Sequence, residues 1–401
     1  MIVVSGLVAL LAVVLWLPSI SDLVSLACLA FRRAVALPPP RGRSAEPPRL
    51  LFLVPAHNEE LLLPACLVSL RKLRYPADRV EVVVIADNCT DGTPTIARAA
   101  GAGCLERHDT THPGKPHAIA WAIEQLPVRE FDAVVIVDAD TNVDAAFAQE
   151  LRALGPLRDR AAQGYFGLSN PEETPLTRMS EVLAAATHRF AYPLKQRAGL
   201  NVPLVGNGMV IGTDVLARYG WHAFSICEDW EMYALLTERG VPIAAAPRAR
   251  IYSQEARSLG QSSTQRQRWT AGRLTVLTRV GPRIVRSRAI RLRQKFDAIA
   301  ELSAPGPALH LGLVVLVGAA GALLHPPAIG LLLTVLAGSL LRPMVYTLAA
   351  LTIDANPVRA VLSFAFLPIY VLWRVGTAVR ALRAVGNAPW VRTERHEARG
   401  A

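Results

Sequence analysis

Two apolar blocks at opposite ends of the chain place the strongest constraint on its fold. Residues 2–31 carry Asp22 as their only charge, and apolar character returns at 305–324 and 328–353. A bilayer core needs about 20 consecutive apolar residues in a helix, and these segments reach that length. A hydrophobic content of 52% with a mean hydropathy of +0.29 excludes a disordered chain. We therefore expect a membrane protein with a water-soluble middle.

The charges beside the apolar segments predict their orientation. No Lys or Arg precedes the first apolar run, whereas Arg32 and Arg33 follow it. By the positive-inside rule, residues 1–33 are expected to form an uncleaved transmembrane anchor whose C-terminal end faces the cytoplasm. The Pro-rich segment 34–48 is predicted to be a linker. Residues 301–354 are predicted to form a transmembrane hairpin.

The segments that flank this hairpin are basic. Residues 258–300 are predicted to form amphipathic interfacial helices, and the arginine-rich stretch 283–295 favours contact with anionic headgroups. Residues 355–401 are predicted to form an interfacial or transmembrane helix and a basic cytoplasmic tail; the charge rule favours the interfacial position. The basic residues behind the net charge of +11 are thus expected to contact the membrane, and no motif indicates nucleic-acid binding. Five scattered cysteines without a CxxC pair predict neither a disulfide framework nor a zinc ribbon.

Residues 49–257 show a different pattern, in which short apolar runs alternate with helical stretches. The runs are continuous, as in parallel strands covered by helices on both faces. They lie at Leu50–Val54, Val82–Ala86 and Val134–Val137, with helical stretches at 58–74, 93–101 and 116–126. This order predicts an α/β fold with a doubly wound, mainly parallel sheet. In such sheets, ligands bind beyond the carboxyl ends of the strands.

Acidic side chains follow two of these strands. Asp87 ends the second, and Asp138-Ala139-Asp140 follows the third. Two neighbouring carboxylates are costly unless a cation holds them, and oxygen-only ligands suit Mg²⁺ or Mn²⁺ on a diphosphate. Asp138 and Asp140 are therefore predicted metal ligands. Asp91-Gly92, by contrast, is explained as a turn.

Two further motifs precede predicted helices. Gly114-Lys115 says little alone, and neither a P-loop nor GxGxxG occurs in the chain. Glu228 and Asp229 stand before a helix predicted at 230–239. The favourable effect of the helix dipole on an acidic residue at a helix start would explain Glu228 or Asp229 alone. It does not explain why both are present and are followed by Glu231 with no basic residue nearby.

Gln265, Arg268 and Trp269 share one face of a predicted helix, because they are three and four positions apart. Two interpretations stay open. The motif is either part of an amphipathic surface helix with a snorkelling arginine, or an arginine placed for a diphosphate beside an aromatic platform for a sugar.

Taken in order, these motifs resemble those of the membrane-integrated family 2 glycosyltransferases, which include cellulose, hyaluronan and poly-N-acetylglucosamine synthases and ceramide glucosyltransferase. The resemblance rests on Asp87, Asp138-x-Asp140, Glu228-Asp229 and Gln265-x-x-Arg268-Trp269, and on the tail Trp390-Val391-Arg392-Thr393-x-Arg395. It implies a GT-A fold with a mixed, mainly parallel sheet. The chain departs from the family at Cys227, where many relatives carry Thr, and in its short membrane region, which argues against a wide polymer channel.

The resemblance also implies roles for individual residues. Asp229 would be the general base, and Asp138 and Asp140 would hold Mg²⁺ or Mn²⁺. The nucleoside diphosphate sugar, a UDP-sugar by the family's preference, would contact Pro55, His57, Glu59, Asp87, Lys115, Asp138 and Arg268. The acceptor would lie near Gly206, Asn207, Gly208, Glu228 and Trp269. Gln265 is the remaining residue of the Gln265-x-x-Arg268-Trp269 motif.

The predicted function is an inverting glycosyl transfer at the cytoplasmic face of the bacterial inner membrane, in extracellular polysaccharide synthesis. The expected partners are the donor, a saccharide or lipid acceptor and the bilayer. Two alternatives stay open: transfer of a single sugar to a membrane lipid, and a non-catalytic membrane scaffold or transporter.

Overall fold

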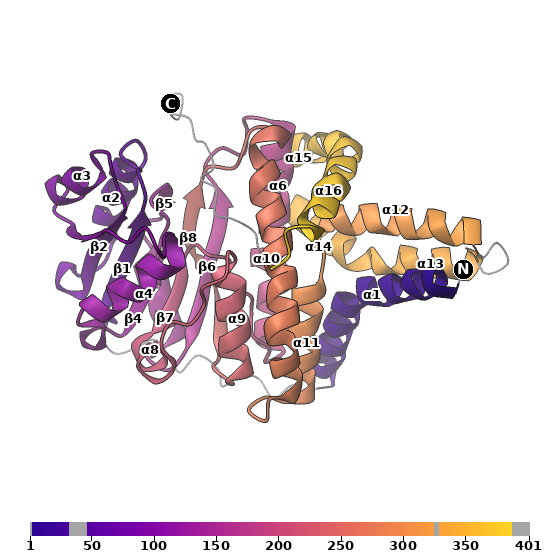
Figure 1. Cartoon of the computed structure of the whole chain (residues 1–401), viewed down its shortest axis with the longest axis horizontal. Coiled ribbons are helices and arrows are strands. Elements are labelled where there is room, and N and C mark those ends of the chain that lie inside the picture. Colours follow the sequence, from indigo (N-terminus) through magenta and orange to yellow (C-terminus); the bar gives the residue numbers. More distant parts are fainter. Residues whose placement is uncertain (1, 32–45, 325–328, 387–401) are drawn as a thin grey trace. The chain divides into compact units, whose positions relative to one another are not determined.

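The computed structural model describes residues 2–31, 46–324 and 329–386 (Figure 1). These residues form two compact units. A strand-rich unit holds 46–170 and 201–255, and a helical unit holds the remainder. The predicted tail motif from Trp390 to Arg395 lies outside the described residues, as does most of the predicted linker 34–48.

The strand-rich unit is built on one eight-stranded sheet. Its strands are β1 (Leu50–Ala56), β2 (Val80–Asp87), β3 (Gly103–Arg107), β4 (Ala133–Ile136), β5 (Thr141–Val143), β6 (Ala161–Leu168), β7 (Met209–Gly212) and β8 (Ile243–Ser253). The spatial order is β3-β2-β1-β4-β7-β6-β8-β5. Strands β3, β2, β1 and β4 run parallel, and so do β6 and β8, whereas β7 is antiparallel to both neighbours and β5 to β8. The mixed, mainly parallel sheet of the sequence prediction is confirmed.

Helices accompany this sheet as the alternating sequence pattern predicts. They are α2 (Leu63–Arg71), α3 (Thr93–Ala99), α4 (Lys115–Gln125), α5 (Phe147–Leu151), α8 (Thr213–Tyr219) and α9 (Glu228–Glu238). Leu50 to Val54 of β1 are fully buried, which explains their continuous apolar character. The prediction that the first helix starts at residue 58 is wrong. Asn58 has a left-handed φ of 55°, so the chain makes a loop before α2 begins.

The helical unit contains the apolar segments from both ends of the chain. Its helices are α1 (Ile2–Ala30), α6 (Pro175–Ala185), α7 (Tyr192–Arg197), α10 (Leu259–Arg286), α11 (Leu292–Ser303), α12 (Pro307–Leu324), α13 (Ile329–Ser339), α14 (Leu341–Thr352), α15 (Pro357–Ser363) and α16 (Leu367–Leu382), with a π-helical turn, Ala186–Ala191, between α6 and α7. Residues 171–200 group with these helices, although the predicted catalytic domain 49–257 included them.

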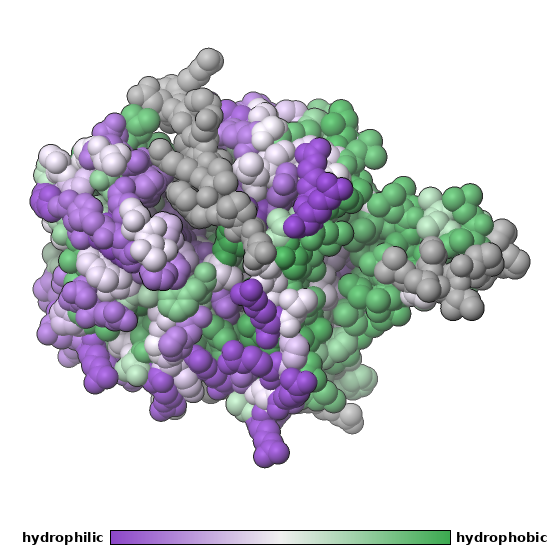
Figure 2. Space-filling model, viewed as in Figure 1, coloured by the Kyte–Doolittle hydropathy of each residue, from purple (hydrophilic) through white to green (hydrophobic). Residues whose placement is uncertain are grey.

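Apolar side chains lie in the contacts between these helices and also on their outer surface (Figure 2). Val8, Ala12 and Leu15 of α1 pack against Val317 of α12 and Leu336 of α13. The outer surface of α12 and α13 is also apolar, as Figure 2 shows in green. Among the described residues, four segments are long and apolar enough to cross a membrane, by length and composition alone: Val8–Ala30, Pro307–Leu324, Ile329–Thr352 and Pro357–Leu382. The interfacial position expected for 355–401 stays a prediction.

A buried cluster of charges holds the helical unit together. Lys195 of α7 forms ion pairs with Asp297 of α11 and, at 3.0 Å, with Glu301 of the same helix. Lys195 is 1% exposed and Asp297 is fully buried. Because an isolated buried charge is very costly, this pairing anchors α7 to α11 and explains why 171–200 pack with the helices.

The same cluster extends to the first helix. Arg342 of α14 donates to Asp22 of α1 and to Glu301, at 2.7 Å and 2.9 Å. The Tyr346 hydroxyl donates to the same Asp22 oxygen at 2.7 Å. Asp22, the only charge in the first apolar run, therefore faces partners inside the protein rather than lipid.

Candidate active site

Lys115 lies at the centre of the acidic groups at the sheet edge. It is the first residue of α4, and its Nζ donates to Asp138 Oδ1 at 2.7 Å and to the Gly206 carbonyl at 2.7 Å. Glu228 Oε1 lies 3.2 Å from the same nitrogen. Segments about 23 to 113 residues apart in the chain therefore meet at one ammonium group. The structure brings together Lys115, Asp138, Gly206 and Glu228 of the predicted site.

Asp229 belongs to the same cluster. Glu228 and Asp229 form the start of α9, so this helix begins earlier than the helix predicted at 230–239. Gly206 has a left-handed φ of 79°, and a Cβ at this position would lie 3.2 Å from Asp229 Oδ2. A side chain at position 206 would therefore both strain the backbone and crowd the carboxylate.

The surroundings of these groups set their protonation. Burial, reinforced by the charge of Glu228, raises the pKa of Asp229 to about 7. Burial alone would disfavour a charged Lys115, but the carboxylates of Asp138, Glu228 and Asp229 outweigh it and raise the pKa of this ammonium. Lys115 thus stays cationic while Asp229 titrates near neutral pH, which suits a general base.

Asn207 positions the loop that carries the Asp138-x-Asp140 pair. Its Oδ1 accepts a hydrogen bond from the Asp138 backbone N–H at 3.2 Å, and its Nδ2 donates to Thr141 Oγ1 at 2.6 Å. The next residue, Gly208, donates its N–H to the Ile136 carbonyl at 2.9 Å. The Gly206-Asn207-Gly208 segment therefore fixes both ends of the acidic loop, and Asn207 is only 3% exposed.

Asp87 is buried and holds the loop that leads to Lys115. Its Oδ1 accepts from Arg107 at 2.6 Å, and its Oδ2 accepts from the Gly114 N–H at 3.0 Å. Arg107 stands directly opposite Asp87 in the β2–β3 register. Sequence reasoning missed Arg107, because no strand is predicted from the sequence at 103–107 that would place a basic residue opposite Asp87. The predicted contact of Asp87 with a donor stays a prediction.

The loop after β1 is fastened to the segment after β2. His57 Nδ1 lies 2.7 Å from the Asp87 carbonyl, and the Glu59 N–H donates to Thr93 Oγ1 at 2.8 Å. Pro55 lies within β1, opposite Ile85 of β2. The three residues predicted for the donor thus stand at the carboxyl end of β1, beside Asp87.

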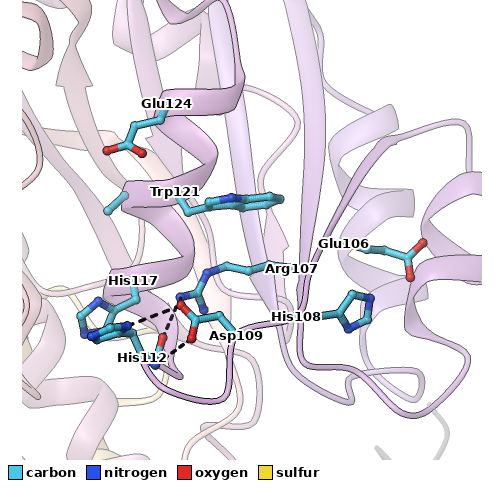
Figure 3. A pocket seen from close by; sticks show the side chains of 9 residues that line it. Glu106, Arg107, His108, Asp109, His112, His117, Trp121 and Glu124 are labelled. Carbon is cyan, nitrogen blue, oxygen red and sulfur yellow. Dashed lines mark hydrogen bonds and ion pairs between the residues drawn. The ribbon is translucent and has the colours of Figure 1, made fainter.

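A cavity of about 460 Å³ opens between the end of β3 and α4 (Figure 3). Arg107 forms one wall, where it donates to Asp109 Oδ2 at 2.6 Å and to the His112 carbonyl at 2.8 Å. His117 of α4 lines it too and stacks on Phe224 at 4.9 Å. Burial, together with the nearby His112, lowers the pKa of His117. None of the predicted site residues lines this cavity.

The predicted metal ligands fit a metal site in which substrate phosphates supply some of the ligands. Within the described ranges, no group of three or more His, Cys, Asp or Glu side chains is placed to hold a metal ion. Mg²⁺ is usually bound by one or two carboxylates together with substrate phosphates and water. Asp138 and Asp140 supply such oxygens; Asp138 Oδ1 faces Lys115, and Asp140 Oδ1 accepts from Thr141 Oγ1 at 3.4 Å.

The remaining predicted residues lie in the helical unit. Gln265, Arg268 and Trp269 are on α10, where Trp269 is 40% exposed. The guanidinium of Arg266 lies 4.8 Å from the centre of the Trp269 ring, a cation–π contact. The roles predicted for Gln265, Arg268 and Trp269 stay predictions.

Comparison with protein families gives a match over more than half of the chain. Residues 47–272 match the family described as "Glycosyltransferase like family 2". Among curated proteins, the chain is 27% identical to "Probable glycosyltransferase YdaM" of Bacillus subtilis, over 59% of this chain and 58% of that protein. It is 22% identical to "Glucomannan 4-beta-mannosyltransferase 7" of Arabidopsis thaliana, over 63% of this chain and 48% of that protein.

A glycolipid enzyme is also similar. The chain is 27% identical to "Beta-monoglucosyldiacylglycerol synthase" of Synechocystis, over 46% of this chain and 39% of that protein. The chain thus spans roughly two fifths to three fifths of the length of the curated relatives it matches. Among solved structures, the mannosyltransferase PcManGT from Pyrobaculum calidifontis, in complex with GDP-Man and Mn²⁺, matches with a TM-score of 0.53 at 18% identity, over 93% of this chain and 98% of that one. This likeness confirms the predicted GT-A fold.

Proposed function

Because the chain belongs to glycosyltransferase family 2, we propose that it transfers a sugar from a nucleoside diphosphate donor to an acceptor hydroxyl, with inversion at the anomeric carbon. The observation that carries this proposal is the grouping of Asp138, Glu228 and Asp229 around Lys115. A base that titrates near pH 7 beside a fixed cation suits the deprotonation of a hydroxyl next to a diphosphate.

In this mechanism Asp229 accepts the proton of the acceptor hydroxyl as the hydroxyl oxygen attacks the anomeric carbon. The bond from that carbon to the diphosphate oxygen breaks, and the leaving group takes the electron pair. Lys115 stays protonated and lies where its charge can stabilise the leaving diphosphate. A Mg²⁺ or Mn²⁺ ion held by Asp138 and Asp140 would supply Lewis-acid stabilisation of the same charge.

The donor is proposed to be a UDP-sugar. His57, Glu59 and Asp87 gather at the carboxyl ends of β1 and β2, where α/β sheets bind their ligands. Arg268 is proposed to meet the diphosphate, and Trp269 the acceptor. The solved relative contains GDP-Man, so a guanosine donor is the competing possibility that the experiment below must test.

Two acceptors are compatible with the chain, and the first is a growing extracellular polysaccharide. One curated relative is named a glucomannan mannosyltransferase, which supports this acceptor. The second is a membrane lipid that receives one sugar. The small number of candidate membrane spans, four among the described residues, and a relative named as a glucosyldiacylglycerol synthase support the second. Either reaction is proposed at the cytoplasmic face of the bacterial inner membrane.

The test uses the purified full chain with a panel of UDP- and GDP-sugars and Mg²⁺ or Mn²⁺, with nucleoside diphosphate release as the readout. We expect release with at least one UDP-sugar, and its loss in Asp229→Asn but not in Asp214→Asn, an exposed carboxylate of α8. Binding of nucleoside diphosphate without turnover of any donor would instead favour a non-catalytic scaffold. A labelled donor then separates the acceptors, because a polymer gives a product ladder and a lipid gives one extractable species.

A further inference from the structure

An aromatic stack joins α4 to the segment 221–227, which leads into α9. The centre of the Phe224 ring lies 4.9 Å from the centre of the His117 ring, and the two ring planes are 23° apart. Rings that are this close and nearly parallel attract each other. The stack therefore links the segment before Asp229 to the helix that begins with Lys115.

Hydrogen bonds shape this segment without attaching it to α4. The Trp221 indole N–H donates to the Ala223 carbonyl at 3.1 Å, and the Ser225 N–H donates to Glu231 Oε2 of α9 at 2.6 Å. Trp221 and Ala223 are buried, whereas Phe224 is 43% exposed. The contact of Phe224 with α4 is therefore additional to the bonds that give the segment its shape.

The loop before α4 holds the other ring of the stack. The His112 ring lies 5.4 Å from the His117 ring, and Figure 3 shows the two next to each other. The His112 carbonyl accepts a hydrogen bond from Arg107 at 2.8 Å, and its N–H donates to Asp109 Oδ1 at 3.0 Å. Both bonds involve a charged group and are therefore among the stronger ones. Because Arg107 ends β3, this loop fixes the His117 ring relative to the sheet.

Two contacts in different directions join the start of α4 to the region of Asp229. One is the Lys115 ammonium, which lies 3.2 Å from Glu228. The other is the stack of His117 on Phe224. Lys115 and His117 are two positions apart, about 200° around the helix. A single contact would let the segment pivot, whereas two contacts on different sides of α4 fix both its position and its orientation.

We propose that His117 and Phe224 are positioning residues, whose stack holds the segment before α9 so that Asp229 faces the acceptor hydroxyl. This inference rests on the proposed function, in which Asp229 is the base. Neither ring is among the groups that react or among the proposed donor contacts. A misplacement of about 1 Å can lower a rate by about 10²-fold, so a modest contact between two rings can have a large effect on kcat.

The first experiment measures kcat and the donor KM by nucleoside diphosphate release from the purified full chain. His117→Leu and Phe224→Leu keep an apolar side chain but remove one ring. We expect each to lower kcat about tenfold to a hundredfold and to leave the donor KM unchanged, because the proposed donor contacts lie elsewhere. His108→Leu, at an exposed histidine just after β3, is the matched control and should keep the wild-type rate.

Variants that keep both rings separate stacking from simple packing. Burial, together with the nearby His112, lowers the pKa of His117, so its ring is neutral near pH 7 and phenylalanine can replace it. His117→Phe and Phe224→Tyr should therefore keep most of the wild-type kcat. The double variant His117→Leu/Phe224→Leu should be no slower than the slower single variant, because both substitutions remove the same contact.

A second measurement follows the segment itself and needs no turnover. Hydrogen–deuterium exchange of the full chain in detergent micelles is read by mass spectrometry. Exchange over 221–227 should become about tenfold faster in both leucine variants, the scale of losing one aromatic pair, and should stay unchanged over β3.

The outcomes separate this inference from the proposed function. If the wild type turns over no donor, the proposed function fails and the positioning role fails with it. If the wild type turns over a donor, this inference alone is overturned by any of three results. These are a wild-type kcat in the leucine variants, a His117→Phe variant as slow as His117→Leu, and unchanged exchange over 221–227. Effects of the two leucine substitutions that multiply in the double variant would likewise show that the rings do not act as a pair.

Discussion

The Lys115 ammonium lies 2.7 Å from Asp138 Oδ1. A side chain at the start of α4 therefore compensates the charge of a carboxylate in the loop after β4. The same ammonium faces Glu228 at 3.2 Å. This cation holds three carboxylates together that would otherwise repel one another.

Lys115→Met should therefore lower kcat/KM by about 10²-fold, the scale of losing one preorganised charge that stabilises a leaving group. Steady-state diphosphate release measures the effect. Lys72→Met, at an exposed lysine just after α2, is the matched control and should leave the rate unchanged. Equal rates in the two variants would remove Lys115 from the mechanism.

Asp229→Asn keeps the size of the side chain but cannot accept a proton. We expect kcat to fall by about 10²- to 10⁴-fold, the range for loss of a general base, while donor binding survives. The measurement is turnover together with donor affinity from calorimetry. If kcat is unchanged, another group takes the proton.

The pH profile follows from the raised pKa of Asp229, about 7, which burial and the charge of Glu228 produce. A base must be deprotonated to act, so kcat/KM should fall as the pH drops below about 7. Glu228→Gln removes a neighbouring negative charge and thereby favours ionised Asp229. Its acidic limb should move to lower pH.

Glu238→Gln, at the far end of α9, serves as the control and should keep the wild-type profile. An acidic limb that stays in place in Glu228→Gln would show that Asp229 does not govern the profile.

Metal removal tests the roles proposed for Asp138 and Asp140. Excess EDTA should abolish diphosphate release, and added Mg²⁺ or Mn²⁺ should restore it, because two carboxylates together with a diphosphate are sufficient ligands for a hard cation. Asp140→Asn should raise the metal concentration needed for half-maximal activity. Full activity in EDTA would contradict the assignment.

The buried Lys195–Asp297 pair predicts a large stability effect. Lys195→Met leaves Asp297 and Glu301 buried without their ammonium, and breaking such a pair costs about 3–5 kcal/mol. Thermal denaturation in micelles should show a drop of several degrees, absent in Lys72→Met. Adding Asp297→Leu should recover part of the loss, since the unpaired carboxylate is then gone; no recovery would show that the pair is not the cause.

How far the sequence predicted the fold depended on the kind of strand. β1, β2 and β4 were identified because their runs are continuous and apolar. β6 is interrupted by Gly164 and Gly167, and β7 offers only three apolar residues between Gly208 and Gly212, so neither carries a pattern of its own. Such strands are stabilised by their neighbours in the sheet, a tertiary effect that periodicity does not contain.

The candidate site shows a similar division. Lys115, Asp138 and Glu228 were named because strand ends meet at one edge of a sheet and because the order of their motifs resembles the family's. Arg107 was missed, because its importance comes from its register opposite Asp87, which requires the pairing of β2 with β3. Asn207 was predicted near the acceptor, yet its side chain bonds the Asp138 loop, an interaction that depends on β7 running antiparallel to β4.

The bond between Asp22 and Arg342 joins residues 320 positions apart and so bears on the order of biosynthesis. At about 5–20 residues per second, the ribosome reaches Arg342 roughly a quarter of a minute to a minute after Asp22. If α1 spans a membrane, as its length and composition allow, its carboxylate would have to be protonated, hydrated or held by the insertion machinery during that interval. The assembly of this protein can therefore be completed only after Arg342 has been synthesised and has reached Asp22.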